Sequence, residues 1–82
     1  MIIARDAFNN IICDVKAFYI NSEGNAINVE NTESYRQVTK NIGSHKVFYA
    51  IDWIFEQMQA QRGNANIFID VCKCPVCEEE KK

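Results

Sequence analysis

The sequence predicts an α+β fold, a small two-layer sandwich in which an antiparallel sheet of three or four strands packs against one long helix at about 44–62. Apolar residues recur with helical spacing in that segment. Elsewhere apolar and polar residues alternate as in half-buried strands, and turn-forming residues separate the segments. A helix and a sheet each hide one apolar side, so packing one on the other satisfies both.

The chain of 82 residues has room for one domain, expected at 1–76, followed by a charged mobile tail at 77–82. Hydrophobic residues make up 48% of the chain, which is too much for a disordered segment with a net charge of -2. No run of residues reaches the length of an apolar membrane span, and no secretory signal is recognised at the N-terminus. We therefore expect a cytoplasmic protein with reduced thiols.

The segment 11–20 fits both a strand and a helix that begins after Asp6. We favour the strand because 21–25, Asn-Ser-Glu-Gly-Asn, is a turn-forming cluster, and Ile27 and Val29 then alternate with polar residues. Together these segments predict a β-hairpin. In its first strand, one face is expected to carry Ile11, Cys13, Val15, Ala17 and Tyr19.

The segment 31–43 leaves two alternatives open. It is either a third strand through Tyr35 to Thr39 or a short helix capped by Thr32.

The long helix is expected to begin at Ser44, a good N-cap residue, and to end before Gly63. Its inward stripe is predicted to contain Val47, Phe48, Ile51, Ile54, Phe55 and Met58. After the loop 64–66, alternation over 67–72 predicts a strand with one face packed on the helix.

The sharpest local motif is Cys74-Pro-Val-Cys77, which resembles half of a zinc knuckle, because a two-residue gap lets both thiolates turn toward one ion. A complete tetrahedral site needs two further ligands, for which Cys72 and either Cys13 or His45 are the candidates. The alternatives are unliganded thiols and a disulfide or redox role. A thioredoxin-like motif is not expected, since that motif opens a helix and no helix is predicted after Cys77.

Enzymatic activity has no support in the sequence. His45 is the only imidazole, and although Tyr49 and Asp52 follow it at helical spacing, no matching nucleophile is present. The three glycines are isolated, so no phosphate-binding loop is predicted. Basic residues are scattered among acids, which makes nucleic-acid binding an unfavoured prediction.

A candidate partner-binding face remains on the long helix. Tyr49 and Trp53 are expected opposite the inward stripe, flanked by Asp52 and Glu56, and exposed aromatic side chains are typical anchors of protein interfaces. We therefore expect a non-enzymatic module that binds another protein or a second copy of itself, with no cofactor.

The chain has 11 Ile, 9 Asn and no Leu, a skew that favours an origin in a phage or mobile element, where an inhibitor of a host or defence factor is a concrete function. The alternative hypothesis is a zinc-stapled module acting in transcription or nucleic-acid processing, with the metal held by Cys72, Cys74, Cys77 and Cys13 or His45.

Overall fold

The computed structural model describes residues 1–32 and 34–78 and shows an α+β fold with one helix of 18 residues. Within the described residues, the elements in chain order are β1 (Ile2–Arg5), β2 (Ile11–Ile12), β3 (Val15–Ile20), β4 (Ile27–Asn31), β5 (Tyr35–Gln37), α1 (Gly43–Ala60), β6 (Ile67–Asp70), the 3-10 helix η1 (Val71–Lys73) and α2 (Pro75–Glu78).

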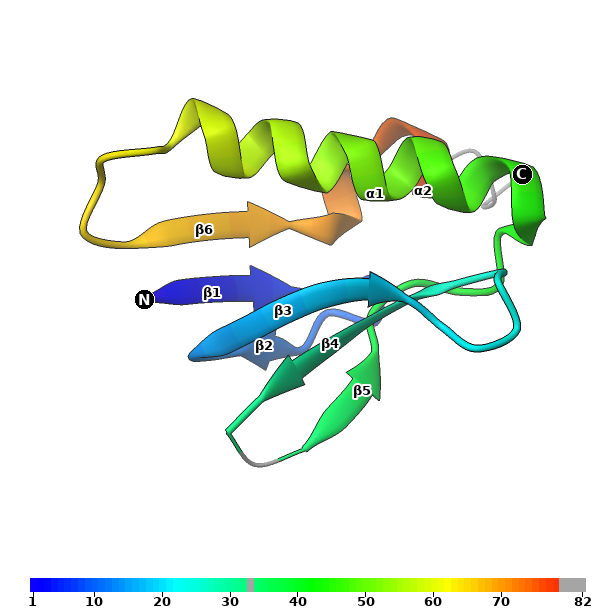
Figure 1. Cartoon of the computed structure of the whole chain (residues 1–82), viewed down its shortest axis with the longest axis horizontal. Coiled ribbons are helices and arrows are strands. Elements are labelled where there is room, and N and C mark those ends of the chain that lie inside the picture. Colours follow the sequence, from blue (N-terminus) through cyan, green and yellow to red (C-terminus); the bar gives the residue numbers. More distant parts are fainter. Residues whose placement is uncertain (33, 79–82) are drawn as a thin grey trace.

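The strands form two three-stranded sheets, so the prediction of one antiparallel sheet is wrong in this respect. The first sheet has the order β2-β1-β6, and the second has the order β3-β4-β5. β1 and β6, the first and last strands of the described chain, pair in parallel and run side by side (Figure 1). Helix α1 connects the second sheet to β6, so the chain returns to the sheet in which it began, beside β1.

The predicted strand 11–20 is interrupted at Asp14, which adopts a left-handed conformation with φ of 57°. Aspartate tolerates that region better than most residues, and the change of direction there ends β2 and sends β3 into the other sheet. A β-bulge between Val15 and Ala17 shifts the side-chain alternation once more. The prediction that Ile11, Cys13, Val15, Ala17 and Tyr19 share one face is therefore wrong, because Val15 is buried whereas Ile11, Cys13 and Ala17 are exposed. The buried residues of this segment are Ile12, Val15 and Phe18.

The predicted hairpin is confirmed as the antiparallel pair of β3 and β4. Its turn is fixed by Asn21, whose side-chain oxygen accepts hydrogen bonds from the N–H groups of Asn25 and Ala26 at 3.0 and 3.3 Å. Of the two alternatives for 31–43, the structure contains the strand. It is shorter than predicted, and all three residues of β5 are exposed.

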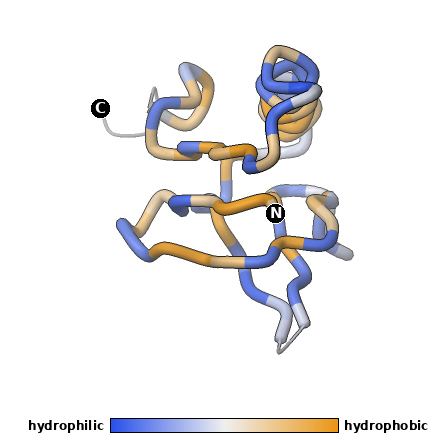
Figure 2. Tube along the Cα trace, turned by 90° about the vertical axis from the view of Figure 1, so that its left-hand side faces the viewer, coloured by the Kyte–Doolittle hydropathy of each residue, from blue (hydrophilic) through white to orange (hydrophobic). Residues whose placement is uncertain are grey.

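The long helix is confirmed, with small differences at its ends. The chain enters α1 at Gly43, with Ile42 as its N-cap and no capping side chain, so the predicted capping role of Ser44 is wrong. Gly63, with φ of 96°, lies in the turn after the helix, where glycine is the residue that adopts a left-handed conformation without strain. In the end-on view of Figure 2, the hydrophobic side of α1 faces the strands.

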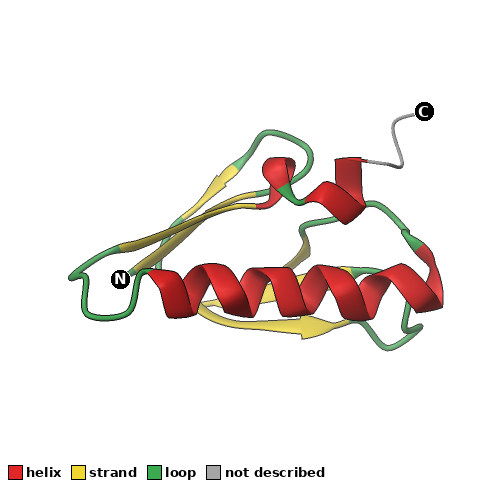
Figure 3. Ribbon diagram, turned by 90° about the horizontal axis from the view of Figure 1, so that it is seen from above, coloured by secondary structure: helices red, strands yellow, loops and turns green. Residues whose placement is uncertain are grey.

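The core lies between α1 and both sheets. Helix α1 contacts β6 of the first sheet and β3 and β4 of the second, while η1 and α2 lie beside it (Figure 3). Fully buried side chains from each layer meet there, including Ile27, Ile54 and Ile69. This packing fixes α1 as an outer layer with one side turned to solvent.

The sequence analysis assigned no strand to Ile2–Arg5, and β1 instead occupies the middle of the first sheet. Directly after β1, Asp6 is 1% exposed, and its carboxylate accepts hydrogen bonds from the N–H groups of Phe8 and Asn10 at 2.9 and 2.8 Å. At the other end, Cys77 and Glu78 belong to α2, whereas 79–82 of the predicted tail lie outside the described residues.

Candidate functional site

The solvent side of α1 carries three exposed aromatic side chains. Phe48, Tyr49 and Phe55 are 60%, 67% and 44% exposed. The prediction that Phe48 and Phe55 point inward is wrong. Successive helical residues diverge by about 100°, so a stripe that included both Val47 and Phe48 would be wider than the surface that the strands cover. The buried residues of α1 are Val47, Ala50, Ile51 and Ile54.

Trp53 differs from its predicted position. It is half-buried and packs against the core, so it does not stand with Tyr49 on the solvent side. On the helix, Trp53 follows Tyr49 by one turn but lies closer to the buried edge of α1. Its ring is therefore held in place by the core, and Tyr49 is the exposed aromatic residue of this pair.

Two carboxylates accompany Tyr49 on the solvent side, as predicted. Asp52 and Glu56 are both exposed, and among the described residues neither side chain forms an ion pair or a hydrogen bond. Exposed carboxylates on one helix face create a local negative potential that attracts basic groups. The face therefore combines apolar anchors with acidic neighbours.

A cavity of about 360 Å³ lies at the C-terminal end of α1. It opens between the helix and the start of β6, and its walls are mostly apolar. The lining residues are Phe55, Met58, Gln59, Arg62, Gly63 and Ile67. The sequence analysis missed this cavity. It is formed where the turn after α1 leads back to β6, a relationship that helical spacing alone does not reveal.

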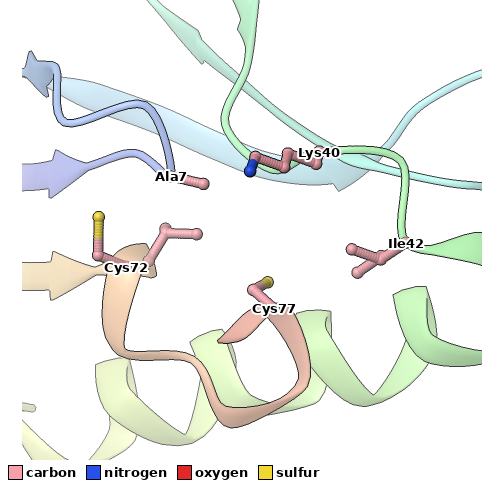
Figure 4. Close-up of a pocket in the computed structure, with 6 residues that line it drawn as sticks. Ala7, Lys40, Ile42, Cys72 and Cys77 are labelled. Atoms are coloured by element: carbon pink, nitrogen blue, oxygen red, sulfur yellow. The ribbon is translucent and has the colours of Figure 1, made fainter. Parts of the chain in front are cut away.

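No disulfide links the four cysteines, all of which lie in the described part of the chain, and they have different surroundings. Cys13 is exposed, Cys72 and Cys77 are half-buried, and Cys74 is buried. Cys72 and Cys77 line one small pocket together with Lys40, but their sulfur atoms stand on different sides of it (Figure 4). Within 1–32 and 34–78, no group of three or more His, Cys, Asp or Glu side chains has an arrangement that could hold a metal ion.

The Cys72 thiol has a specific partner. Its sulfur donates a hydrogen bond to the backbone carbonyl of Asp6 at 2.9 Å, which links η1 to the turn after β1. The motif itself contains a helix start that the sequence analysis did not predict: Cys74 comes directly before the short helix α2, which contains Cys77. Proline at the first position of α2 suits a helix start because that position needs no N–H donor.

His45 is exposed on the first turn of α1. Among the described side chains it takes part in no hydrogen bond or ion pair, and it lines none of the cavities described above.

No helix in the described part of the chain has the length and apolar character of a membrane span. No protein-family model, no curated protein and no solved structure matches this chain.

Proposed function

We propose that this chain is a small, non-enzymatic protein-binding module whose contact surface is the solvent side of α1. The observation that carries the proposal is the exposure of Phe48, Tyr49 and Phe55 on one rigid helix. Aromatic side chains provide large contact areas at low entropic cost and are enriched among the residues that dominate binding energy. A helix anchored by the core presents them without a prior ordering step.

The chemistry of this surface specifies the kind of site that it fits. Tyr49 is the central anchor, and it suits an apolar pocket on the partner. Asp52 and Glu56 suit basic side chains at the rim of that pocket, where opposite charges accelerate association and exclude acidic competitors. Trp53 contributes to this surface indirectly. It packs against the core and thereby supports the helical turn that carries Tyr49 and Asp52.

The composition supports a more specific form of this proposal. A chain rich in Ile and Asn and without Leu is consistent with a phage or mobile-element protein that inhibits a cytoplasmic host or defence factor by occupying its surface. Occupation of a surface needs no catalytic group, so the absence of a recognised catalytic motif in the sequence does not conflict with it.

The test begins with a photo-crosslinking amino acid at position 49, irradiated in lysate, and with the same group at position 35 as a matched control. Tyr35 and Tyr49 are equally exposed, at 68% and 67%, but Tyr35 lies on β5. A protein crosslinked from position 49 alone is the candidate partner, and its affinity is then measured with purified components.

Tyr49→Ala is expected to weaken this binding at least about tenfold, as for a central interface anchor, while Tyr35→Ala leaves it unchanged. Equal effects of the two substitutions, or crosslinks that do not depend on the position, contradict the proposal.

A further inference from the structure

A second stripe runs along α1, beside Tyr49 and Glu56. Its members follow one another at spacings of four and three residues, the spacing of a coiled-coil seam. All five are exposed: Phe48, Asp52, Phe55, Gln59 and Arg62. Arg62 lies in the turn that continues α1, where its N–H donates to the carbonyl of Gln59 at 3.2 Å. A seam of this spacing keeps facing the same side over its whole length, so it suits a second helix lying along it.

The charges of this seam are complementary to those of a second copy in the opposite direction. Asp52 lies toward the start of the seam and Arg62 at its end, about 15 Å further along the helix axis. Within the described part of the chain, the side chains of Asp52 and Arg62 form no ion pair or hydrogen bond. An antiparallel two-fold arrangement places Asp52 of each copy against Arg62 of the other, so the dimer contains two such ion pairs.

The cavity of about 360 Å³ fits the same register. When Asp52 of one copy is opposite Arg62 of the other, Phe48 reaches beyond Arg62 to the loop before Ile67. Gly63 and Ile67 line the cavity there, together with Met58. Phe48 is 60% exposed in the single chain and would gain an apolar site in this arrangement. The two Phe55 rings meet near the two-fold axis.

We propose that this chain forms an antiparallel homodimer through the seam of Phe48, Asp52, Phe55, Gln59 and Arg62. The proposal rests on the proposed function in one respect, that the solvent side of α1 is a contact surface. It assigns Phe48, Asp52 and Phe55 to a second copy, so that in the dimer these three residues no longer contact a different protein. Tyr49 and Glu56 lie on the neighbouring part of the helix and stay available to a different protein. The dimer thus presents two such binding surfaces.

Charge reversal at two positions tests the register itself. Asp52→Arg places two arginines together at both ends of the dimer, and Arg62→Asp places two aspartates together. Sedimentation equilibrium is expected to show a dimer for the unchanged protein and a dissociation constant raised at least about tenfold for each single variant. Circular dichroism and thermal unfolding verify that these surface variants are folded.

The decisive measurement mixes the two single variants. In the mixed dimer, Arg at position 52 of one copy faces Asp at position 62 of the other, while the unchanged Arg62 and Asp52 face each other at the opposite end. The mixture is therefore expected to dimerise at least about tenfold more tightly than either variant alone. The double variant D52R/R62D is expected to dimerise with itself and not with the unchanged protein.

Tyr35→Ala is the control, because Tyr35 is exposed on β5 and not on α1, and it is expected to leave the dissociation constant unchanged. A monomer at every concentration, or a mixture no tighter than its components, overturns the homodimer. Those results leave the partner-binding proposal intact, since that proposal is decided by crosslinking from position 49. If the chain dimerises as expected but no protein is crosslinked specifically from position 49, only the partner-binding proposal is overturned.

Discussion

The side chain of Gln61 forms two hydrogen bonds with the backbone of Phe68. Its amide nitrogen donates to the Phe68 carbonyl, and its oxygen accepts from the Phe68 N–H, both at 2.8 Å. β6 is an edge strand, and the backbone N–H and carbonyl of Phe68 point away from β1. The primary amide thus takes the place of a neighbouring strand. Free strand edges invite pairing with other chains, so this contact also protects the edge.

Gln61→Ala is expected to lower the free energy of unfolding by about 1–2 kcal/mol, the net value of two hydrogen bonds. Gln61→Glu keeps an acceptor for the Phe68 N–H but cannot donate to the carbonyl when ionised, so an intermediate loss is expected. Urea denaturation at low protein concentration measures both. The control is Gln59→Ala, which removes an exposed amide without a backbone partner among the described residues. A loss no larger than that of the control contradicts the structural role of Gln61.

The carboxylate of Asp6 organises the turn between β1 and β2. Asp6→Ala leaves the partly buried N–H groups of Phe8 and Asn10 without their acceptor, and the loss of hydrogen bonds to a charged group costs about 1.5–3 kcal/mol. We expect a total loss of about 2–4 kcal/mol in the free energy of unfolding. Asp6→Asn keeps an acceptor oxygen, so its loss should be smaller.

Glu23→Ala, at an exposed position in the hairpin turn, is the matched control for Asp6 and is expected to change the stability by less than about 0.5 kcal/mol. Similar losses for Asp6→Ala and Glu23→Ala in chemical denaturation would show that the turn does not depend on the Asp6 carboxylate.

Substitutions of Trp53 and Tyr49 are expected to differ in their effect on stability. Because Trp53 packs against the core, Trp53→Ala should lower the free energy of unfolding by about 2 kcal/mol, less than a fully buried tryptophan would cost. Tyr49→Ala removes a side chain that is 67% exposed and should cost less than about 0.5 kcal/mol. Thermal and chemical unfolding provide the comparison. If Trp53→Ala unfolds like the unchanged protein, the ring does not stabilise the core.

The helical periodicity after Ser44 and the turn cluster before Ile27 are local signals, and both predicted the right elements. The division into two sheets depends on Asp14. Its left-handed backbone was not predictable from composition because most aspartates in such positions are right-handed or extended. β1 was missed because its pairing partner, β6, lies at the other end of the sequence. Only the tertiary fold brings these two segments together.

For the candidate site, the sequence correctly placed Tyr49, Asp52 and Glu56 on the solvent side of α1. It did not predict that Trp53 is half-buried or that Phe48 is exposed. Both adjoin the buried stripe, and which edge of an amphipathic helix is covered depends on the elements beside it. A signal for Phe48 was nevertheless present. It shares a four-three spacing with Asp52, Gln59 and Arg62, and a stripe that contains these polar residues indicates an outward face.

The thiols should differ in reactivity in the order of their exposure. Cys13 is exposed, Cys72 and Cys77 are half-buried, and Cys74 is buried, so a maleimide reagent should modify Cys13 first and Cys74 last. Cys72 should react more slowly than its exposure alone implies, because a hydrogen bond to the Asp6 carbonyl holds its sulfur against the turn after β1.

Mass spectrometry of digested samples at successive times gives the order of modification, and Cys13→Ser identifies the fast phase. The same experiment decides the zinc-stapled alternative. Thiolates that coordinate zinc are protected together and released together by a chelator. If Cys72, Cys74 and Cys77 are all protected until a chelator is added, and native mass spectrometry finds one bound zinc, the cysteines form a metal site. If Cys72 and Cys77 react before Cys74 and the chelator changes nothing, the thiols are structural residues, each with its own surroundings.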